Sequence, residues 1–204
     1  MAKRTSVEPR KRPTQQRSRA TVEAVLEAAA YILVREGYER TTTNRIAERA
    51  GVNIASLYQY FPHKDALVAE LLRRHVELTE THILRELRAL PGADLRSTLQ
   101  AVITAGIAEH AVSPALHRVF TEQRGHPGPD AAPSRGEVEL RDEVRRAVTN
   151  DACGVPDLEF ALWLVEVVLH AAVHQATIER PDDVQSGRVA SELLALLMPY
   201  LVRR

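Results

Sequence analysis

The sequence predicts an all-α protein of about nine helices, with a small three-helix N-terminal domain followed by a larger helical domain. Apolar residues recur at helical spacing through most of the chain, and no stretch alternates polar and apolar residues as a strand would. The 204 residues, 45% hydrophobic and 26% charged, are enough to bury a core. One cysteine, Cys153, cannot build a disulfide framework.

The two ends of the chain differ in charge. Residues 1–20 hold seven Lys or Arg and one acid, whereas residues 76–204 hold thirteen basic and nineteen acidic side chains. Pro9 and Pro13 disfavour a helix at the start, so residues 1–16 are expected to form a disordered basic arm. Such asymmetry favours contact with a polyanion at one end, although a solubilising tail would have the same composition.

Cap and breaker residues bound three N-terminal helices, predicted over residues 21–36, 44–50 and 54–60. A glycine follows each of the first two, and Pro62 stops the third. Thr42, with Thr43, can cap the second helix, and Asn53 can cap the third. A long helix is predicted over residues 64–90, and further helices over 94–112, 114–123, 137–152, 157–179 and 184–202. The glycine- and proline-rich stretch 125–136 is expected to be a loop.

The two short helices and the turn between them have a helix-turn-helix signature. Gly51 permits the tight turn, and apolar residues at packing positions join the helices: Ile46, Ala47, Ala50, Val52 and Leu57. The second short helix has no acidic residue, as expected for a helix that lies against phosphates and reaches base edges. Five of its residues are expected to face outward: Ile54, Ala55, Ser56, Gln59 and Tyr60. The alternative is an ordinary helical corner.

Residues 42–52 (TTNRIAERAGV) and 56–67 (SLYQYFPHKDAL) closely resemble the N-terminal domain of tetracycline-repressor-type (TetR family) transcriptional regulators. The resemblance implies a helix-turn-helix domain over residues 17–66 that reads a palindromic operator on double-stranded DNA. It also implies an effector-binding and dimerisation domain over residues 67–204. The expected protein is a homodimeric, ligand-responsive repressor that a small molecule releases from DNA.

Roles in DNA contact follow from the same resemblance. Thr43, Tyr58 and Lys64 match positions at which the family contacts phosphates. Positions that vary with operator sequence hold Asn44, Arg45, Ile54, Ala55, Ser56, Gln59 and Tyr60. Of these, Arg45 suits a guanine edge and Gln59 an adenine edge. Tyr58 could instead be partly core, and Arg45 only a solvated charge. Tyr60 and His63 depart from the family's usual His and Asn, and His63 is expected to weaken the cap of the long helix.

The larger domain should contain a dimer face and an effector pocket. The helix at 157–179 is apolar on more than one side, and the helix at 184–202 is similarly rich in apolar residues. The resemblance implies that these two helices form a four-helix dimer interface, and the alternative is that both fill the core of one chain. The expected pocket is mostly aliphatic and takes a small hydrophobic effector. Its assigned residues are His110, His117, Phe120, Gln123, Trp163, Glu166, His170 and His174.

Glu166, His170 and His174 are spaced four residues apart and form one polar stripe. A zinc site, a pocket or dimer contact, and an edge that faces water remain alternatives for this stripe, and no metal is assigned.

Enzyme motifs are missing: the sequence has no GxGxxG or GxxxxGK[ST] loop, no HExxH and no GxSxG. We therefore expect no catalytic residue and no cofactor. The longest apolar run, Ala28 to Val34, is shorter than the twenty or so residues of a membrane span, and no secretory signal is expected. The sequence is thus interpreted as a cytoplasmic DNA-binding repressor. The alternatives are a helical small-molecule sensor without DNA binding and an all-α enzyme.

Overall fold

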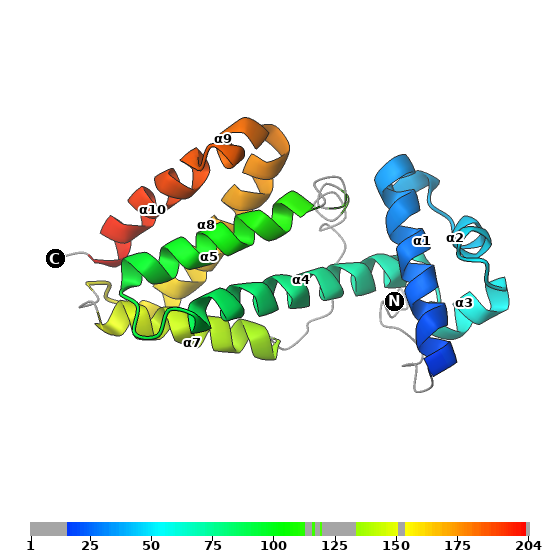
Figure 1. Ribbon diagram of the computed structural model, residues 1–204, viewed down its shortest axis with the longest axis horizontal. Helices are drawn as coiled ribbons and strands as arrows, with labels where there is room; N and C mark the ends of the chain where they lie inside the picture. Colours follow the sequence, from blue (N-terminus) through cyan, green and yellow to red (C-terminus); the bar gives the residue numbers. More distant parts are fainter. Residues whose placement is uncertain (1–15, 113–115, 117–118, 120–133, 151–153, 203–204) are drawn as a thin grey trace, which may run out of the picture. The chain divides into compact units, whose positions relative to one another are not determined.

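The computed structural model describes residues 16–112, 116, 119, 134–150 and 154–202. These residues form nine helices and no strand (Figure 1). The helices are α1 (Gln16–Arg40), α2 (Thr43–Ala50), α3 (Ile54–Tyr60), α4 (Lys64–Arg88), α5 (Leu95–Val112), α7 (Arg135–Asn150), α8 (Leu158–Glu179), α9 (Pro181–Gln185) and α10 (Arg188–Leu201). The predicted all-α class is confirmed.

Gly37 and Gly187 each interrupt a helical stretch, the first as predicted and the second not. At Gly37, φ is 76° and ψ is 173°, so α1 is interrupted there, as the sequence predicted, and three further residues follow to Arg40. Gly187, with a φ of 76°, separates α9 from α10. The prediction of one helix over residues 184–202 is therefore wrong, because a left-handed residue cannot continue a helix. Most of the helix predicted over 114–123, and Cys153, lie outside the described residues.

The described chain divides into two compact units. The first, called the head below, comprises residues 16–76 with Leu116 and Val119. The second, called the body, comprises residues 77–112, 134–150 and 154–202. The boundary follows Val76 and lies inside α4, a helix that contains neither glycine nor proline.

The head is built around one apolar core to which α1, α2 and α3 all contribute. Ile46 of α2 and Leu57 of α3 are 0% exposed, and Ala50 and Val52 pack at the edge of this core. The helix-to-helix packing predicted from the spacing of these residues is confirmed. Both short helices therefore have a fixed outer face.

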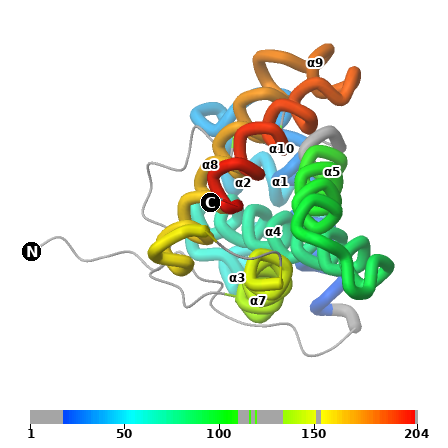
Figure 2. Tube along the Cα trace, turned by 90° about the vertical axis from the view of Figure 1, so that its left-hand side faces the viewer, coloured from blue at the N-terminus to red at the C-terminus, as the bar shows by residue number. Residues whose placement is uncertain are grey.

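The body core lies among α5, α7, α8 and α10. α10 packs against both α5 and α8 (Figure 2). The most completely buried side chains of this core are aliphatic: Leu95, Leu99, Ile103, Val148, Ala161 and Leu201. Among the described helices, α8 alone has the length and apolar composition of a membrane span, which is weak evidence because the core helices of globular proteins meet the same criteria.

Candidate nucleic-acid interface

Local hydrogen bonds define both ends of the turn between α2 and α3. The Thr42 hydroxyl accepts a bond from the Arg45 N–H (3.4 Å), and the Asn53 side chain accepts one from the Ala55 N–H (2.8 Å). Gly51 is left-handed, with a φ of 65°, and ends α2. The caps predicted from Thr42 and Asn53 are confirmed, and they set the start of each helix through bonds to neighbouring backbone groups.

The outer face of α2 and α3 carries most of the residues expected on it. Asn44, Arg45, Ala55, Tyr58 and Gln59 are exposed, while Thr43, Ile54, Ser56 and Lys64 are partly buried. Within α3 there is no acidic side chain.

Tyr60 is the exception. The expectation that it faces outward is wrong, because it is 7% exposed and packs into the head core. It lies three residues after Leu57, which places both side chains on the buried face of α3.

Thr43 and Tyr58 bring two hydroxyl groups together. Their oxygens are 2.9 Å apart and hydrogen-bonded, which links the first turn of α2 to the middle of α3. Tyr58 is 40% exposed, so its ring is not core. One hydroxyl uses its hydrogen in this bond, and the other keeps a hydrogen that it can donate to an anionic oxygen, so the pair can contact one phosphate beside the N-terminus of α2.

Arg45 is not simply a solvated charge. Its guanidinium forms a bidentate ion pair with Glu36 of α1, in which Nη2 donates to Oε1 at 2.5 Å and Nη1 donates to Oε2. Nη1 also donates to the Arg40 carbonyl oxygen at 3.3 Å. Hydrogen bonding and attraction to Glu36 raise the pKa of Arg45. The sequence did not predict Glu36 as a partner of Arg45, because no sequence pattern indicates an ion pair between residues nine positions apart across a turn.

Lys64, at the start of α4, is held by Tyr38. Its ammonium donates to the Tyr38 carbonyl oxygen (3.0 Å) and lies 3.8 Å from the centre of the Tyr38 ring. The Tyr38 hydroxyl donates to Asp65. Burial raises the pKa of Tyr38 above its usual range, and the hydrogen bond to Asp65 raises it further.

His63 caps α4, contrary to expectation. Its Nδ1 accepts a bond from the Ala66 N–H at 3.2 Å. The expectation of a weak cap is wrong for a simple reason: Nδ1 is two bonds from Cβ, as the side-chain oxygen of asparagine is, and reaches the same backbone group.

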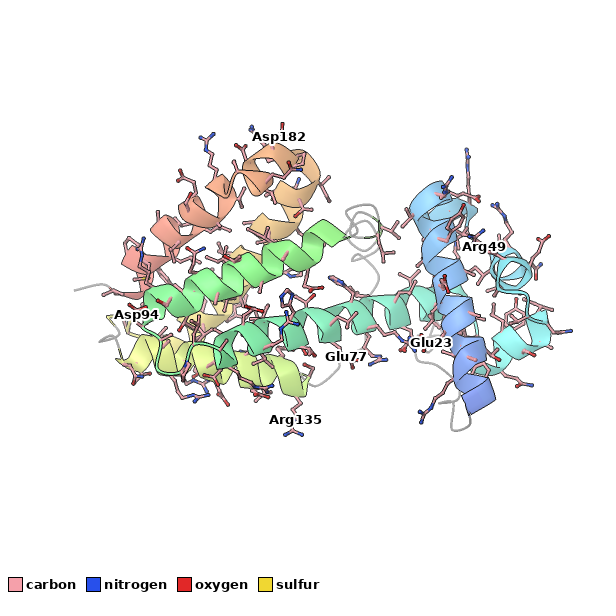
Figure 3. The ribbon with its side chains drawn as sticks, in the orientation of Figure 1. Glu23, Arg49, Glu77, Asp94, Arg135 and Asp182 are labelled. Atoms are coloured by element: carbon pink, nitrogen blue, oxygen red, sulfur yellow. The ribbon has the colours of Figure 1, made fainter. Side chains whose placement is uncertain are left out.

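A second set of contacts joins α4 to α1 within the head. The Arg74 Nη1 donates to Glu23 at 2.6 Å, and its Nε donates to Glu70 at 2.9 Å; Figure 3 labels Glu23 on α1. Glu70 is 8% exposed and also binds Arg73. Burial alone would raise the pKa of Glu70, but the two guanidinium groups outweigh it and hold that pKa below its usual value. These contacts fix the first half of α4 to the head.

The expected pocket residues of the body do not gather at one described site. Trp163 is 51% exposed beside Phe160, and its assignment to the effector site stays a prediction. Glu166 is exposed and paired with Arg141 at 2.9 Å. His174 is 6% exposed, and its ring centre lies 4.8 Å from that of His170. Three assigned residues, together with the side chain of His110, lie outside the described part: His117, Phe120 and Gln123.

Two polar contacts of the body, one partly buried and one at a buried carboxylate, were not found from the sequence. The His82 Nδ1 on α4 lies 2.5 Å from a carboxylate oxygen of Glu109 on α5. Glu80 is 9% exposed and accepts the Ser134 hydroxyl bond at 2.7 Å. Within the described ranges, no three His, Cys, Asp or Glu side chains are grouped so that they could hold a metal.

Family models match both parts of the chain. Residues 25–71 match the model described as "Bacterial regulatory proteins, tetR family", and residues 94–201 match "Tetracyclin repressor-like, C-terminal domain". The second match alone covers more than half of the 204 residues.

Individual relatives are similar over shorter or more distant alignments. The transcriptional repressor KstR2 of Rhodococcus jostii is 30% identical over 102 residues, which are 50% of this chain and 49% of that protein. The chain spans between 36% and 51% of the length of the curated relatives that it matches.

Two solved structures show the similarity of fold. The fatty acid degradation regulator FadR from Bacillus halodurans has a TM-score of 0.68 at 15% identity and covers 92% of this chain and 97% of its own. A TetR variant from Acinetobacter baumannii, solved in complex with minocycline, has a TM-score of 0.59 at 19% identity over 86% and 93% of the two chains.

Proposed function

The chain belongs to the TetR family of bacterial transcriptional regulators, and we propose that it is a ligand-responsive repressor that binds a palindromic operator as a homodimer. On this proposal it acts in the cytoplasm, needs no cofactor and catalyses no reaction. The observation that carries the proposal is the outer face of the head. There the acid-free α3 carries Tyr58, whose hydroxyl is bonded to that of Thr43 on α2, and the first turn of α4 adds the restrained ammonium of Lys64.

The proposed contacts divide into two kinds. Thr43, Tyr58 and Lys64 contact phosphates, which set the position of the head on the duplex. The bases are read by the remaining outward residues: Asn44, Arg45, Ile54, Ala55, Ser56 and Gln59. Arg45 reads a base only after it leaves Glu36, and a guanine edge offers the two acceptors that replace the two carboxylate oxygens.

We expect Lys64→Ala to weaken binding to operator and mismatched DNA alike, because a phosphate contact carries no sequence information. The plot of log affinity against log salt should become flatter by about one unit per half-site. Gln59→Ala should leave that slope unchanged and alter preference at one base pair by about 1–3 kcal/mol. Fluorescence anisotropy over a salt series, with an operator recovered by selection from genomic DNA, measures both effects.

These two variants test the assigned roles against each other. A Lys64→Ala protein with a changed base preference and an unchanged salt slope would contradict the assignment. If the wild-type chain bound no DNA fragment at low salt, the alternative of a sensor protein without DNA binding would replace the repressor.

The dimer is proposed to form through α8 and α10. One side of α8 is in the body core, while Phe160, Trp163 and Val167 on its other side are 44–54% exposed. Leu196 of α10 is 62% exposed and borders a groove of about 460 Å³. The groove is lined almost entirely by apolar residues: Leu164, Val165, Val168, Leu196, Leu197, Pro199 and Tyr200. Exposed apolar side chains on both helices, together with an apolar groove between them, favour burial against a second copy.

The effector is proposed to act through α4. Lys64 lies in the first turn of this helix, while Ile83, Leu84 and Leu87 near its end are buried. A ligand that favours another position of α4 would change the separation of the two α3 helices. That separation must be about 34–36 Å, one turn of DNA, for both to enter the major groove. Effector and operator then weaken each other's binding by the same factor.

We expect the strongest effector to be largely apolar and neutral or weakly anionic, because aliphatic side chains dominate the body core. At a concentration of about 100 times its Kd, such a ligand should stabilise the folded protein by about 2.7 kcal/mol. Thermal shift and operator binding, followed together over neutral, anionic and cationic compounds of matched size, measure this. The fluorescence of Trp163 is unsuitable as a signal for ligand binding, because this residue lies on the proposed dimer face. A strongly cationic best ligand, or one that left operator affinity unchanged, would contradict the prediction.

A further inference from the structure

We propose that Tyr38 is a positioning residue for DNA binding: its carbonyl oxygen and ring face hold the Lys64 ammonium in place, and its hydroxyl engages the neighbouring Asp65 carboxylate. This inference rests on the proposed function, in which Lys64 contacts a phosphate. It adds a residue of α1 that touches no DNA itself and acts through the first turn of α4.

Three contacts of Tyr38 carry the inference. The Lys64 Nζ lies 3.0 Å from the Tyr38 carbonyl oxygen and 3.8 Å from the ring centre. The ring is itself fixed at its far end, because the hydroxyl donates to Asp65. Tyr38 also packs at the edge of a small apolar cluster with Leu33 and Val68. The ring therefore has little freedom to move away from the ammonium.

The ammonium keeps capacity for a phosphate. It has three N–H groups, of which one donates to the carbonyl and one faces the ring. A lysine side chain that moves freely loses much rotamer freedom when it binds a phosphate, and one already held loses less. Tyr38 therefore lowers the entropic cost of the contact.

The Asp65 carboxylate is a negative charge beside the proposed phosphate contact of Lys64. It is the residue after Lys64, so its carboxylate would repel a phosphate bound there. The Tyr38 hydroxyl donates to Oδ1 of this carboxylate. The His63 Nδ1 lies 3.7 Å from Oδ2 but accepts the Ala66 N–H, so it donates no bond to the carboxylate. A hydrogen-bonded carboxylate is less able to fold back onto the lysine. The same tyrosine thus restrains the cation and engages its nearest competitor.

The test is a double-mutant cycle on the full chain, with a short mixed-sequence duplex as the probe, since phosphate contacts do not need the operator. We expect Tyr38→Leu to lower affinity for the duplex by about threefold to tenfold. This is the range of one cation–π contact together with the loss of restraint on the Lys64 side chain. In a Lys64→Ala background the same substitution should change affinity by less than about twofold. Both variants keep the backbone carbonyl, but Tyr38→Phe also keeps the ring face and loses only the bond to Asp65, so its affinity should lie between those of the wild type and Tyr38→Leu.

A loss of affinity from Tyr38→Leu that is equal with and without Lys64 would overturn the proposal, because a merely structural role does not depend on the lysine. Unchanged DNA affinity in Lys64→Ala would reject the phosphate contact of the proposed function, and the positioning role with it. A second measurement does not need the leucine variant to fold. In NMR spectra of the wild-type and Tyr38→Phe proteins, the Lys64 ε-methylene protons should be shifted upfield by the ring, and ordinary lysine shifts would equally overturn the proposal.

Discussion

Leu57→Ala is expected to destabilise the head by about 2–5 kcal/mol, the cost of a cavity at a fully buried leucine. Leu57 is 0% exposed and packs among residues of α1, α2 and α4. A loss of this size is comparable with the whole stability of many small domains. The variant should therefore lose DNA binding through unfolding of the head, without any change to the residues that face the DNA.

Denaturant unfolding followed by two spectroscopic probes measures this effect. Four of the five tyrosines lie in the head, whereas the only tryptophan, Trp163, lies in the body. The midpoint of the tyrosine signal should fall while the tryptophan midpoint changes less. Gln59→Ala, on the exposed face of the same helix, is the matched control and should shift stability by no more than about 0.5 kcal/mol. A wild-type tyrosine midpoint in Leu57→Ala would contradict the described core.

Leu196→Glu is expected to convert the dimer to monomers and to lower operator affinity by about 10²–10⁴-fold, because each head then binds without the other. The side chain is 62% exposed in a single chain, so the substitution should not unfold the body. In the dimer, however, the carboxylate would be buried against an apolar surface without a partner, at high cost. Light scattering after gel filtration measures the mass, and anisotropy measures the affinity.

Gln185→Glu adds the same charge at an exposed position of α9 and should leave both quantities unchanged. A Leu196→Glu protein that stayed dimeric, with wild-type operator affinity, would place the interface elsewhere than on α8 and α10.

Local signals explain what could be predicted from the sequence. The bounds of α3 match the prediction because Asn53 and Pro62 act on backbone groups within a few residues. The face of α3 was harder to assign, since only packing in the head core decides that Tyr60 is buried. Likewise, periodicity shows that α8 is apolar all round but not which side meets the chain's own core, so the exposure of Trp163 could not be predicted.

The candidate site shows the same division. Arg45 and Lys64 were assigned through a motif, whereas the groups that restrain them come from more distant positions. Glu36 lies nine residues before Arg45, and Tyr38 lies twenty-six before Lys64. Nothing in the spacing of these residues indicates an ion pair or a ring contact, because both depend on how α1 crosses the start of α2 and α4. Tertiary packing, rather than local propensity, decides which charges are available to a ligand.

The uninterrupted course of α4 past Val76 has a consequence for chimaeric regulators. When a loop joins two parts, residues can be added or removed with little effect on orientation. A helix transmits torsion, so each residue inserted or deleted turns the C-terminal remainder of the helix by about 100° and shifts it by about 1.5 Å. Exchanging the head of one regulator for that of another therefore means splicing within a helix, and the splice must conserve helical phase.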